Sequence, residues 1–323
     1  MHEHARIASV VSLLALAGIG TVGCASAPDN VSYGTLESEA EGRTMAYSVY
    51  TPPGWDGETP LPLVVFLHGG GDDETVLEER AVVAHTLDEW IEAGRLDPFI
   101  MVAPDGERGF WTNWHDGSHH YEDYVVDEII PEMYANYPIL EGRENRHLMG
   151  ISMGGAGTMY TTIHNIELFA SATVLSAPLF DVDMTMEFLD GKGLGGRIPT
   201  ERLFGPPDRD KVEQSNPFAV LDDPGDLRGT KLLVGVGRLD LPGLLKSNRK
   251  FHEHLERHEV PHHYLEYAGG HGWRSWSRLF PVALCLHMRG EGCELDDSRF
   301  YDLERANHDA QLATSPSPDD RDL

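Results

Sequence analysis

Short, continuous runs of apolar residues recur along this chain, separated by segments in which apolar positions follow helical spacing. The runs lie at 61–67, 99–103, 172–177 and 231–237. Such runs, which lack the polar alternation of a half-exposed strand, are typical of strands buried on both faces of a parallel sheet. An alternating segment at 44–50 predicts an edge strand, and segments such as 75–93 and 121–137 predict amphipathic helices. The pattern therefore predicts an α/β fold, a mostly parallel central sheet with helices on both faces.

Four segments depart from this alternation. Residues 1–27 have the composition of a targeting segment, residues 28–42 are expected to be a linker, and the polar, acidic residues 291–323 are expected to be a largely disordered C-terminal extension. Residues 181–229 are rich in Gly and Pro and lack sustained periodicity, which predicts an irregular insertion near the functional site. Residues 43–290, which include this insertion, are predicted to form one domain.

The N-terminal segment predicts an exported protein. Its apolar run at 7–22 is too short to predict a membrane span, and small residues follow it. The sequence ending at Cys24 is similar to a bacterial lipobox, in which Cys24 would be lipidated and become the mature N-terminus. The alternative is ordinary cleavage after 25–27. We therefore expect a lipoprotein of the bacterial cell envelope, with membrane contact only through that anchor, or else a periplasmic or secreted protein.

Charge and cysteine content narrow the partners and the compartment. The 323 residues include 53 acidic and 25 basic side chains, a formal net charge of −28. Such a charge repels nucleic acid, so a nucleic-acid partner is excluded. The chain has 3 cysteines. If Cys24 is lipidated, Cys285 and Cys293 remain, and in an oxidising compartment we expect these two to form a disulfide.

A serine flanked by glycines is the central chemical motif. Gly150-Ile151-Ser152-Met153-Gly154 matches G-x-S-x-G, and it stands between a strand-like run and a helical segment. This context predicts a sharp strand-to-helix turn that exposes the Ser152 hydroxyl. Glycines suit the turn because a strained nucleophile backbone leaves little room beside it.

The other parts of a nucleophilic site follow further predicted strands. Serine requires a base, and the base requires a buried acid that fixes its tautomer. Ser152, Asp240 and His271 each follow a predicted strand, in the chain order of α/β-hydrolases. His68-Gly69-Gly70-Gly71 follows the run at 61–67, and its glycines let backbone N–H groups approach a developing oxyanion.

Two further sequence patterns are less specific indicators of function. Trp111 and Trp114 lie in an aromatic loop after the run at 99–103, where they could form a substrate platform or simply pack. Residues 258–262 match the H-E-x-x-H pattern of zinc proteases, but Pro261 breaks the helix that this pattern requires. Zinc is therefore not expected at this motif, and catalysis by a nucleophilic serine requires no metal or organic cofactor.

Together these motifs resemble the esterase D-like "putative esterase" family of α/β-hydrolases. This family includes tributyrin-type, feruloyl and acetyl-xylan esterases, S-formylglutathione hydrolases and the antigen 85 mycolyltransferases. The resemblance extends from about Thr44 to Met288 and is strongest at the serine and histidine loops.

The resemblance implies roles for particular residues. Ser152 would be the nucleophile, His271 the base and Asp240 the orienting acid. The backbone N–H groups of Gly70 and Met153 would stabilise the oxyanion. Three more residues of the matching motifs are expected to contact the substrate: His68, Gly71 and Trp273.

The expected function is that of an exported serine carboxylesterase. It would hydrolyse short-chain or carbohydrate-linked esters through an acyl-enzyme on Ser152. The alternatives are an acyltransferase of the same fold, and a non-catalytic envelope binding protein on a hydrolase scaffold.

Overall fold

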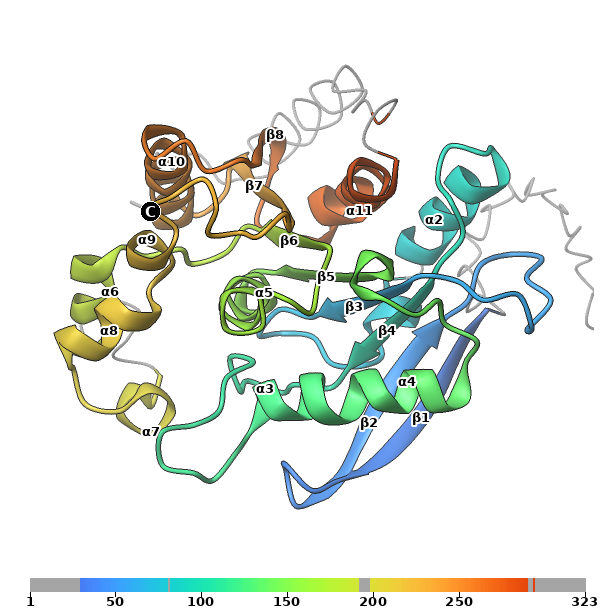
Figure 1. The fold of residues 1–323 in the computed structure, drawn as a ribbon, viewed down its shortest axis with the longest axis horizontal. Helices are drawn as coiled ribbons and strands as arrows, with labels where there is room; N and C mark the ends of the chain where they lie inside the picture. Colours follow the sequence, from blue (N-terminus) through green and yellow to red (C-terminus); the bar gives the residue numbers. More distant parts are fainter. Residues whose placement is uncertain (1–29, 81, 192–197, 290–292, 294–323) are drawn as a thin grey trace, which may run out of the picture.

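Within residues 30–80, 82–191, 198–289 and 293, which the computed structural model describes, eight strands form one sheet (Figure 1). The strands are β1 (Val31–Ser38), β2 (Arg43–Tyr50), β3 (Leu63–Leu67), β4 (Ile100–Pro104), β5 (Arg146–Ile151), β6 (Ser171–Leu175), β7 (Lys231–Leu239) and β8 (His263–Gly270). Their spatial order is β1-β2-β4-β3-β5-β6-β7-β8. The targeting segment, Cys24 and most of the C-terminal extension lie outside the described residues.

The sheet is parallel except near its first edge. β1 pairs antiparallel with β2, and β2 pairs antiparallel with β4, whereas every later pair is parallel. The predicted fold class is therefore confirmed. Two details of the prediction were wrong: the expected linker 28–42 contains β1, and the segment 44–50 belongs to the second strand, not to the edge. β1 escaped prediction because its side chains are mostly polar and exposed.

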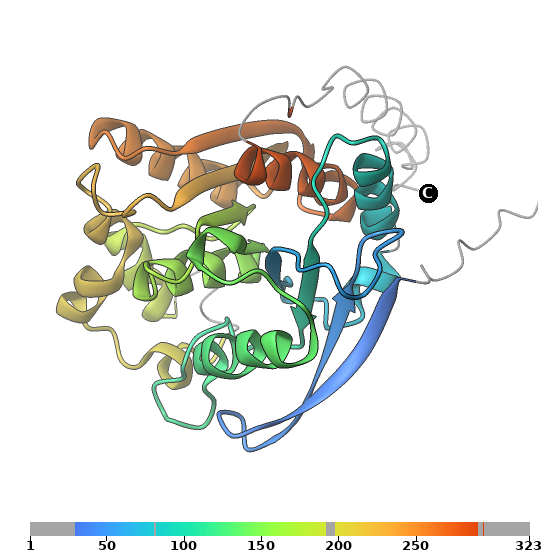
Figure 2. The same ribbon diagram turned by 45° about the vertical axis from the view of Figure 1, so that its right-hand side comes forward.

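Helices cover both faces of the sheet (Figure 2). The longer helical segments are α2 (Val82–Glu92), the continuous run α3 (Tyr121–Asp123), η1 (Tyr124–Ile129) and α4 (Ile130–Asn136), α5 (Met153–His164), α10 (Pro242–Arg257) and α11 (Trp273–Met288). α2 and α11 pack on one face, in a core that includes Phe66 and Phe280. On the other face, η1 and α4 cover one end of the sheet, while α5 and α10 pack against β6 and β7 in a core that includes Val234 and Phe251.

The remaining helices are short. They are α1 (Val76–Glu79), η2 (Arg143–Asn145), α6 (Val182–Leu189), α7 (Thr200–Phe204), α8 (Arg209–Ser215) and α9 (Pro217–Val220). Residues 181–229, expected to be irregular, thus contain four helices in their described part. The helix expected over 75–93 is divided into α1 and α2. Among the described residues, none of the helices has the length and apolar character needed to cross a membrane.

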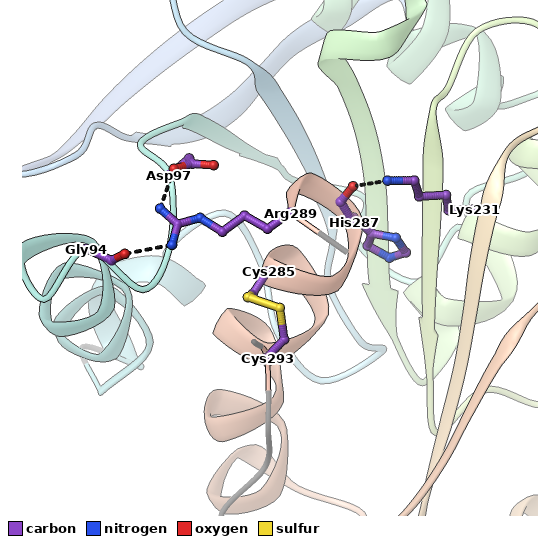
Figure 3. Close-up of a disulfide and its surroundings, with 7 residues drawn as sticks. All are labelled: Gly94, Asp97, Lys231, Cys285, His287, Arg289 and Cys293. Carbon is purple, nitrogen blue, oxygen red and sulfur yellow. Dashed lines mark hydrogen bonds and ion pairs between the residues drawn. A yellow bond between two sulfur atoms is a disulfide. The ribbon is translucent and has the colours of Figure 1, made fainter. Parts of the chain in front are cut away.

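The end of α11 is tied to the end of α2 (Figure 3). The Arg289 guanidinium donates to the Gly94 carbonyl at 2.6 Å and to the Asp97 carboxylate at 2.5 Å. The sulfur atoms of Cys285 and Cys293 lie 1.97 Å apart, the distance of a disulfide. This end of α11 lies at the start of β7, where Lys231 donates to the His287 carbonyl. The other end begins two residues after His271.

Candidate active site

Ser152 occupies a strained turn between β5 and α5. Its φ is 53° and its ψ is −117°, a conformation that residues with side chains rarely adopt. The Ser152 N–H donates to the Leu175 carbonyl at the end of β6 at 2.8 Å, which ties the turn to the neighbouring strand. A Cβ at Gly154 would lie 1.9 Å from the Leu67 carbonyl oxygen, and one at Gly150 would lie 2.2 Å from the Gly154 carbonyl oxygen. Glycines at 150 and 154 are therefore what allow β3, β5 and α5 to approach so closely.

The structure brings together the three side chains that follow β5, β7 and β8. The Ser152 Oγ lies 3.0 Å from His271 Nε2, and His271 Nδ1 lies 2.8 Å from Asp240 Oδ1. The Asp240 side chain is fully buried, whereas the His271 side chain keeps 24% of its surface exposed. The imidazole can therefore reach both the hydroxyl and an incoming ligand. The carboxylate is shielded from water and faces the imidazole.

A second layer of hydrogen bonds holds Asp240. Ser176, at the end of β6, donates its hydroxyl proton to Asp240 Oδ2 at 2.6 Å. Since that hydroxyl has one proton, its oxygen accepts from the Tyr267 hydroxyl at 2.8 Å and from the Trp276 indole N–H at 3.0 Å. Burial, more than any other cause, raises the pKa of Tyr267, which keeps this hydroxyl protonated as a donor. Ser176 belongs to no sequence motif and lies inside the apolar run at 172–177, but in the structure it directly follows β6 and so lies at the same edge of the sheet as Ser152.

The glycine loop after β3 presents its backbone to Ser152. His68 is fully buried, and its Nε2 accepts a hydrogen bond from the Gly106 N–H at 2.9 Å. Nδ1 therefore carries the proton and donates it to the Gly69 carbonyl at 2.8 Å, where the Asp72 N–H also donates at 3.1 Å. In a trans peptide the C=O and the next N–H point in opposite directions, so these bonds also fix the direction of the Gly70 N–H.

The second backbone donor predicted for the oxyanion lies beside this loop. Met153 opens α5, and the N–H groups of a first helical turn have no acceptor within the helix. A Cβ at Gly70 would lie 3.9 Å from the Met153 Cβ, so the two residues are neighbours. The Arg108 guanidinium, which belongs to no sequence motif, donates to the Gly70 carbonyl at 3.1 Å and helps to hold the glycine loop in place.

Two residues expected to contact the substrate are buried, which corrects that expectation. His68 has no exposed surface, and its two ring nitrogens are occupied as described above. Trp111 is 1% exposed, and its indole N–H donates to the His68 carbonyl at 3.1 Å. Both side chains form hydrogen bonds to the backbone of the glycine loop and so help to fix its conformation. Sequence motifs identified this loop but could not tell which of its side chains face inward.

The other three expected contacts remain accessible to different degrees. Gly71 is exposed. Trp114 is half-buried, its indole N–H donating to the Gly109 carbonyl and its ring lying under the Arg202 guanidinium. Trp273 is half-buried, and its N–H donates to both Asp72 carboxylate oxygens at 3.1 Å. This last contact links the histidine loop to the glycine loop.

The described part of the chain holds no cluster of three or more His, Cys, Asp or Glu side chains arranged for a metal ion. α10 ends at Arg257, so His258 and His262 of the H-E-x-x-H match lie beyond the helix. Their ring nitrogens bond the Asp222 and Val260 carbonyls.

This strand order, with a strained serine, a histidine and a buried aspartate at the carboxyl ends of parallel strands, defines an α/β-hydrolase fold. The chain belongs to the "Putative esterase" family, whose sequence profile matches residues 38–287.

Relatives carry esterase names. The chain is 27% identical over 173 residues to an endo-1,4-beta-xylanase/feruloyl esterase of Xylanibacter ruminicola, covering 51% of this chain and 23% of that one. It is 24% identical over 263 residues to Esterase Rv1288 of Mycobacterium tuberculosis, covering 75% of this chain and 56% of that one. The chain thus spans about a quarter to just over half of these relatives. Among solved structures, a ferulic acid esterase superposes with a TM-score of 0.67 at 23% identity, covering 80% of this chain and 97% of that one.

Proposed function

We propose that this protein is a carboxylic ester hydrolase that forms an acyl-enzyme on Ser152. The observation that carries the proposal is the chain of contacts from Ser152 Oγ through the His271 imidazole to the buried Asp240 carboxylate, at 3.0 and 2.8 Å. Membership of an esterase family supports the same chemistry.

The proposed reaction has two half-reactions. Ser152 Oγ attacks the ester carbonyl carbon while His271 Nε2 takes the hydroxyl proton, and the backbone N–H groups of Gly70 and Met153 stabilise the oxyanion. When the carbonyl reforms, the bond to the alcohol oxygen breaks and His271 gives its proton to that oxygen. Water then attacks the acyl-enzyme in the same way, which releases the acid and restores Ser152.

The proposed substrate is a short-chain or carbohydrate-linked ester, and the proposed location is the bacterial envelope. The name of the Xylanibacter relative, which joins a xylanase to a feruloyl esterase, favours the carbohydrate-linked class. We propose that the protein is exported and lipidated at Cys24. A disulfide between Cys285 and Cys293 is consistent with export, because disulfides persist in oxidising compartments. An acyltransferase would share every step up to the acyl-enzyme and differ only in the acceptor.

The test compares the purified wild type with Ser152→Ala on p-nitrophenyl esters from acetate to long chains and on methyl ferulate. We expect kcat/KM to fall at least about 10⁴-fold, because the nucleophile is lost, while circular dichroism and thermal unfolding stay unchanged. Ser215→Ala on α8 is the matched control and should keep full activity. Repeating the assay with added methanol separates hydrolysis from acyl transfer by the amount of methyl ester formed.

Two results would overturn the proposal. A Ser152→Ala protein as active as the wild type would remove the serine from the mechanism. A folded wild type that hydrolyses none of these esters, yet binds a carbohydrate or lipid component of the envelope, would favour the binding-protein alternative.

A further inference from the structure

Two exposed leucines border the buried carboxylate of the site. Among the described residues, four large apolar side chains are exposed: Tyr33, Leu140, Leu239 and Leu241. Leu239 is 67% exposed and Leu241 is 50% exposed, and they stand on either side of Asp240. Single exposed leucines are ordinary on protein surfaces. A pair bracketing the group that orients His271 is not explained by that general tendency.

Both leucines are tied by backbone contacts to the residues that would handle the proton. Leu239 is the register partner of Gly270, the residue before His271, and a β-bulge separates it from Gly237. Bulges of this kind re-aim side chains beside active sites. The Leu241 N–H donates at 2.7 Å to Asp240 Oδ1, the same oxygen that lies 2.8 Å from His271 Nδ1.

The fold itself gives no reason for leucine at position 241. Leu241 is the N-cap of α10, and its side chain makes no capping hydrogen bond. Ser, Asp and Asn are strongly preferred there because their side chains accept from the free N–H groups of the first turn, whereas leucine is among the poorest caps. α10 packs on the sheet through residues further along, including Leu244, Phe251 and Leu255. Leu241 therefore neither caps the helix nor lies buried in the core. Positions where a residue does not suit its local structure are expected at functional sites.

From these contacts we infer that Leu239 and Leu241 form an apolar lip that receives the alcohol half of the ester, and that this alcohol carries an alkyl or aryl group. The inference rests on the proposed ester hydrolysis. His271 Nε2 must reach the alcohol oxygen to protonate it, so the exposed edge of this imidazole borders the leaving alcohol. Leu239 and Leu241 flank the same imidazole through Gly270 and Asp240. Leucine side chains recognise such a group by removing its apolar surface, and their own, from water. Of the two proposed substrate classes, the leucines favour a short-chain ester of an apolar alcohol over an ester of an unsubstituted sugar hydroxyl, in contrast to the class suggested by the name of the Xylanibacter relative.

The test uses two acetate esters that differ in one atom of the alcohol: butyl acetate and 2-methoxyethyl acetate. The variants are Leu239→Asn, Leu241→Asn and the double variant, because asparagine matches leucine in size. We expect the ratio of kcat/KM for the butyl ester to that for the methoxyethyl ester to fall about three- to tenfold in the double variant. Leu140→Asn, on an exposed leucine that precedes β5 at the opposite end of the sheet, is the matched control and should leave the ratio unchanged.

Two further readouts separate this role from structural damage. Disturbance of Asp240 would lower kcat for both esters equally and leave the ratio as it was. Leu241→Asn should also raise the thermal midpoint, since asparagine can cap α10. In Leu241→Asn we therefore expect the preference for the butyl ester to fall while the thermal midpoint rises.

Several outcomes would overturn the lip while leaving ester hydrolysis intact. One is a wild type active on both esters whose ratio is unchanged in the double variant. Another is an unchanged ratio together with a smaller mass in solution, which would assign the leucines to self-association. A third is a wild type that prefers a glucose acetate to butyl acetate. A wild type inactive on every ester would instead count against the proposed function.

Discussion

The two ends of the parallel strands hold histidines in contrasting surroundings. At the carboxyl ends, His271 is partly exposed and lies between a serine hydroxyl and a buried carboxylate. At the amino ends, His147 at the start of β5 is buried and lies 2.8 Å from the Ser171 hydroxyl. His287 of α11 is buried against the Thr173 hydroxyl; Figure 3 shows this histidine beside Lys231. Burial, and secondly the nearby Lys231 ammonium, lowers the pKa of His147 to about 4.

A histidine beside a hydroxyl acts as a base only where its surroundings stabilise the charged imidazolium. A carboxylate stabilises the imidazolium that forms when the hydroxyl proton is taken, whereas an apolar setting with an ammonium opposes it. At the carboxyl ends, the backbone of two serines is also strained, because Ser152 and Ser176 both have positive φ, at 53° and 52°. Strain of this kind persists where the surrounding structure enforces it and collects at functional sites.

The largest loss of activity is expected when Asp240 loses its negative charge. In Asp240→Asn, the neutral amide no longer stabilises the imidazolium. Where its N–H instead of its oxygen faces His271 Nδ1, it also favours the tautomer with its proton on Nε2, pointing at Ser152. We expect kcat for a p-nitrophenyl ester to fall about 10⁴-fold with little change in KM. Asp222→Asn, in the exposed turn before β7, is the control and should remain active. Full activity in Asp240→Asn would show that the carboxylate does not distinguish the two ends.

His147, at the amino ends of the strands, should affect the pH dependence of the unfolding free energy and leave the activity unchanged. The folded pKa of His147, about 4, lies below the value of 6.5 expected for an unfolded chain. The unfolded state therefore binds more protons below pH 6.5, so this contribution to stability is complete above that pH and is lost as the pH falls toward 4. The shift corresponds to about 3 kcal/mol of unfolding free energy.

His147→Asn measures this contribution directly. Asparagine can keep a hydrogen bond to Ser171 but does not titrate. Urea unfolding at pH 7.5 and pH 4.5 should show that the variant loses about 2 kcal/mol less than the wild type over this range. Ester hydrolysis at pH 7.5 should stay unchanged. Equal losses of unfolding free energy in the two proteins would mean that folding does not lower the pKa of His147.

The sequence predicted the elements and motifs whose signal is local. Buried strands are continuous apolar runs, and the serine elbow requires glycines at fixed spacing, so both could be found without tertiary information. β1 was mistaken for a linker because an edge strand with exposed polar side chains has the composition of a loop. His68 and Trp111 were assigned to the substrate because the burial of a loop side chain depends on elements distant in sequence, here the Gly106 N–H and the glycine loop itself.

A weaker loss of catalysis than that of Asp240→Asn is predicted for one member of a matched pair of serines, one at each end of the strands. Ser176→Ala removes the hydroxyl that donates to Asp240 and leaves the Tyr267 and Trp276 donors without their acceptor. Ser171→Ala removes the hydroxyl beside His147. Each change should cost about 1–3 kcal/mol of unfolding free energy, because buried polar groups lose partners.

Only the first change should also affect catalysis. Without Ser176, the Asp240 carboxylate keeps its charge but loses one of the bonds that fix its position, so kcat should fall about tenfold at constant KM. Ser171→Ala should keep the wild-type kcat despite a similar loss of stability. If both variants lost kcat in proportion to stability, the second layer around Asp240 would be structural, and the functional contrast between the two ends would reduce to the Ser152, His271 and Asp240 contacts alone.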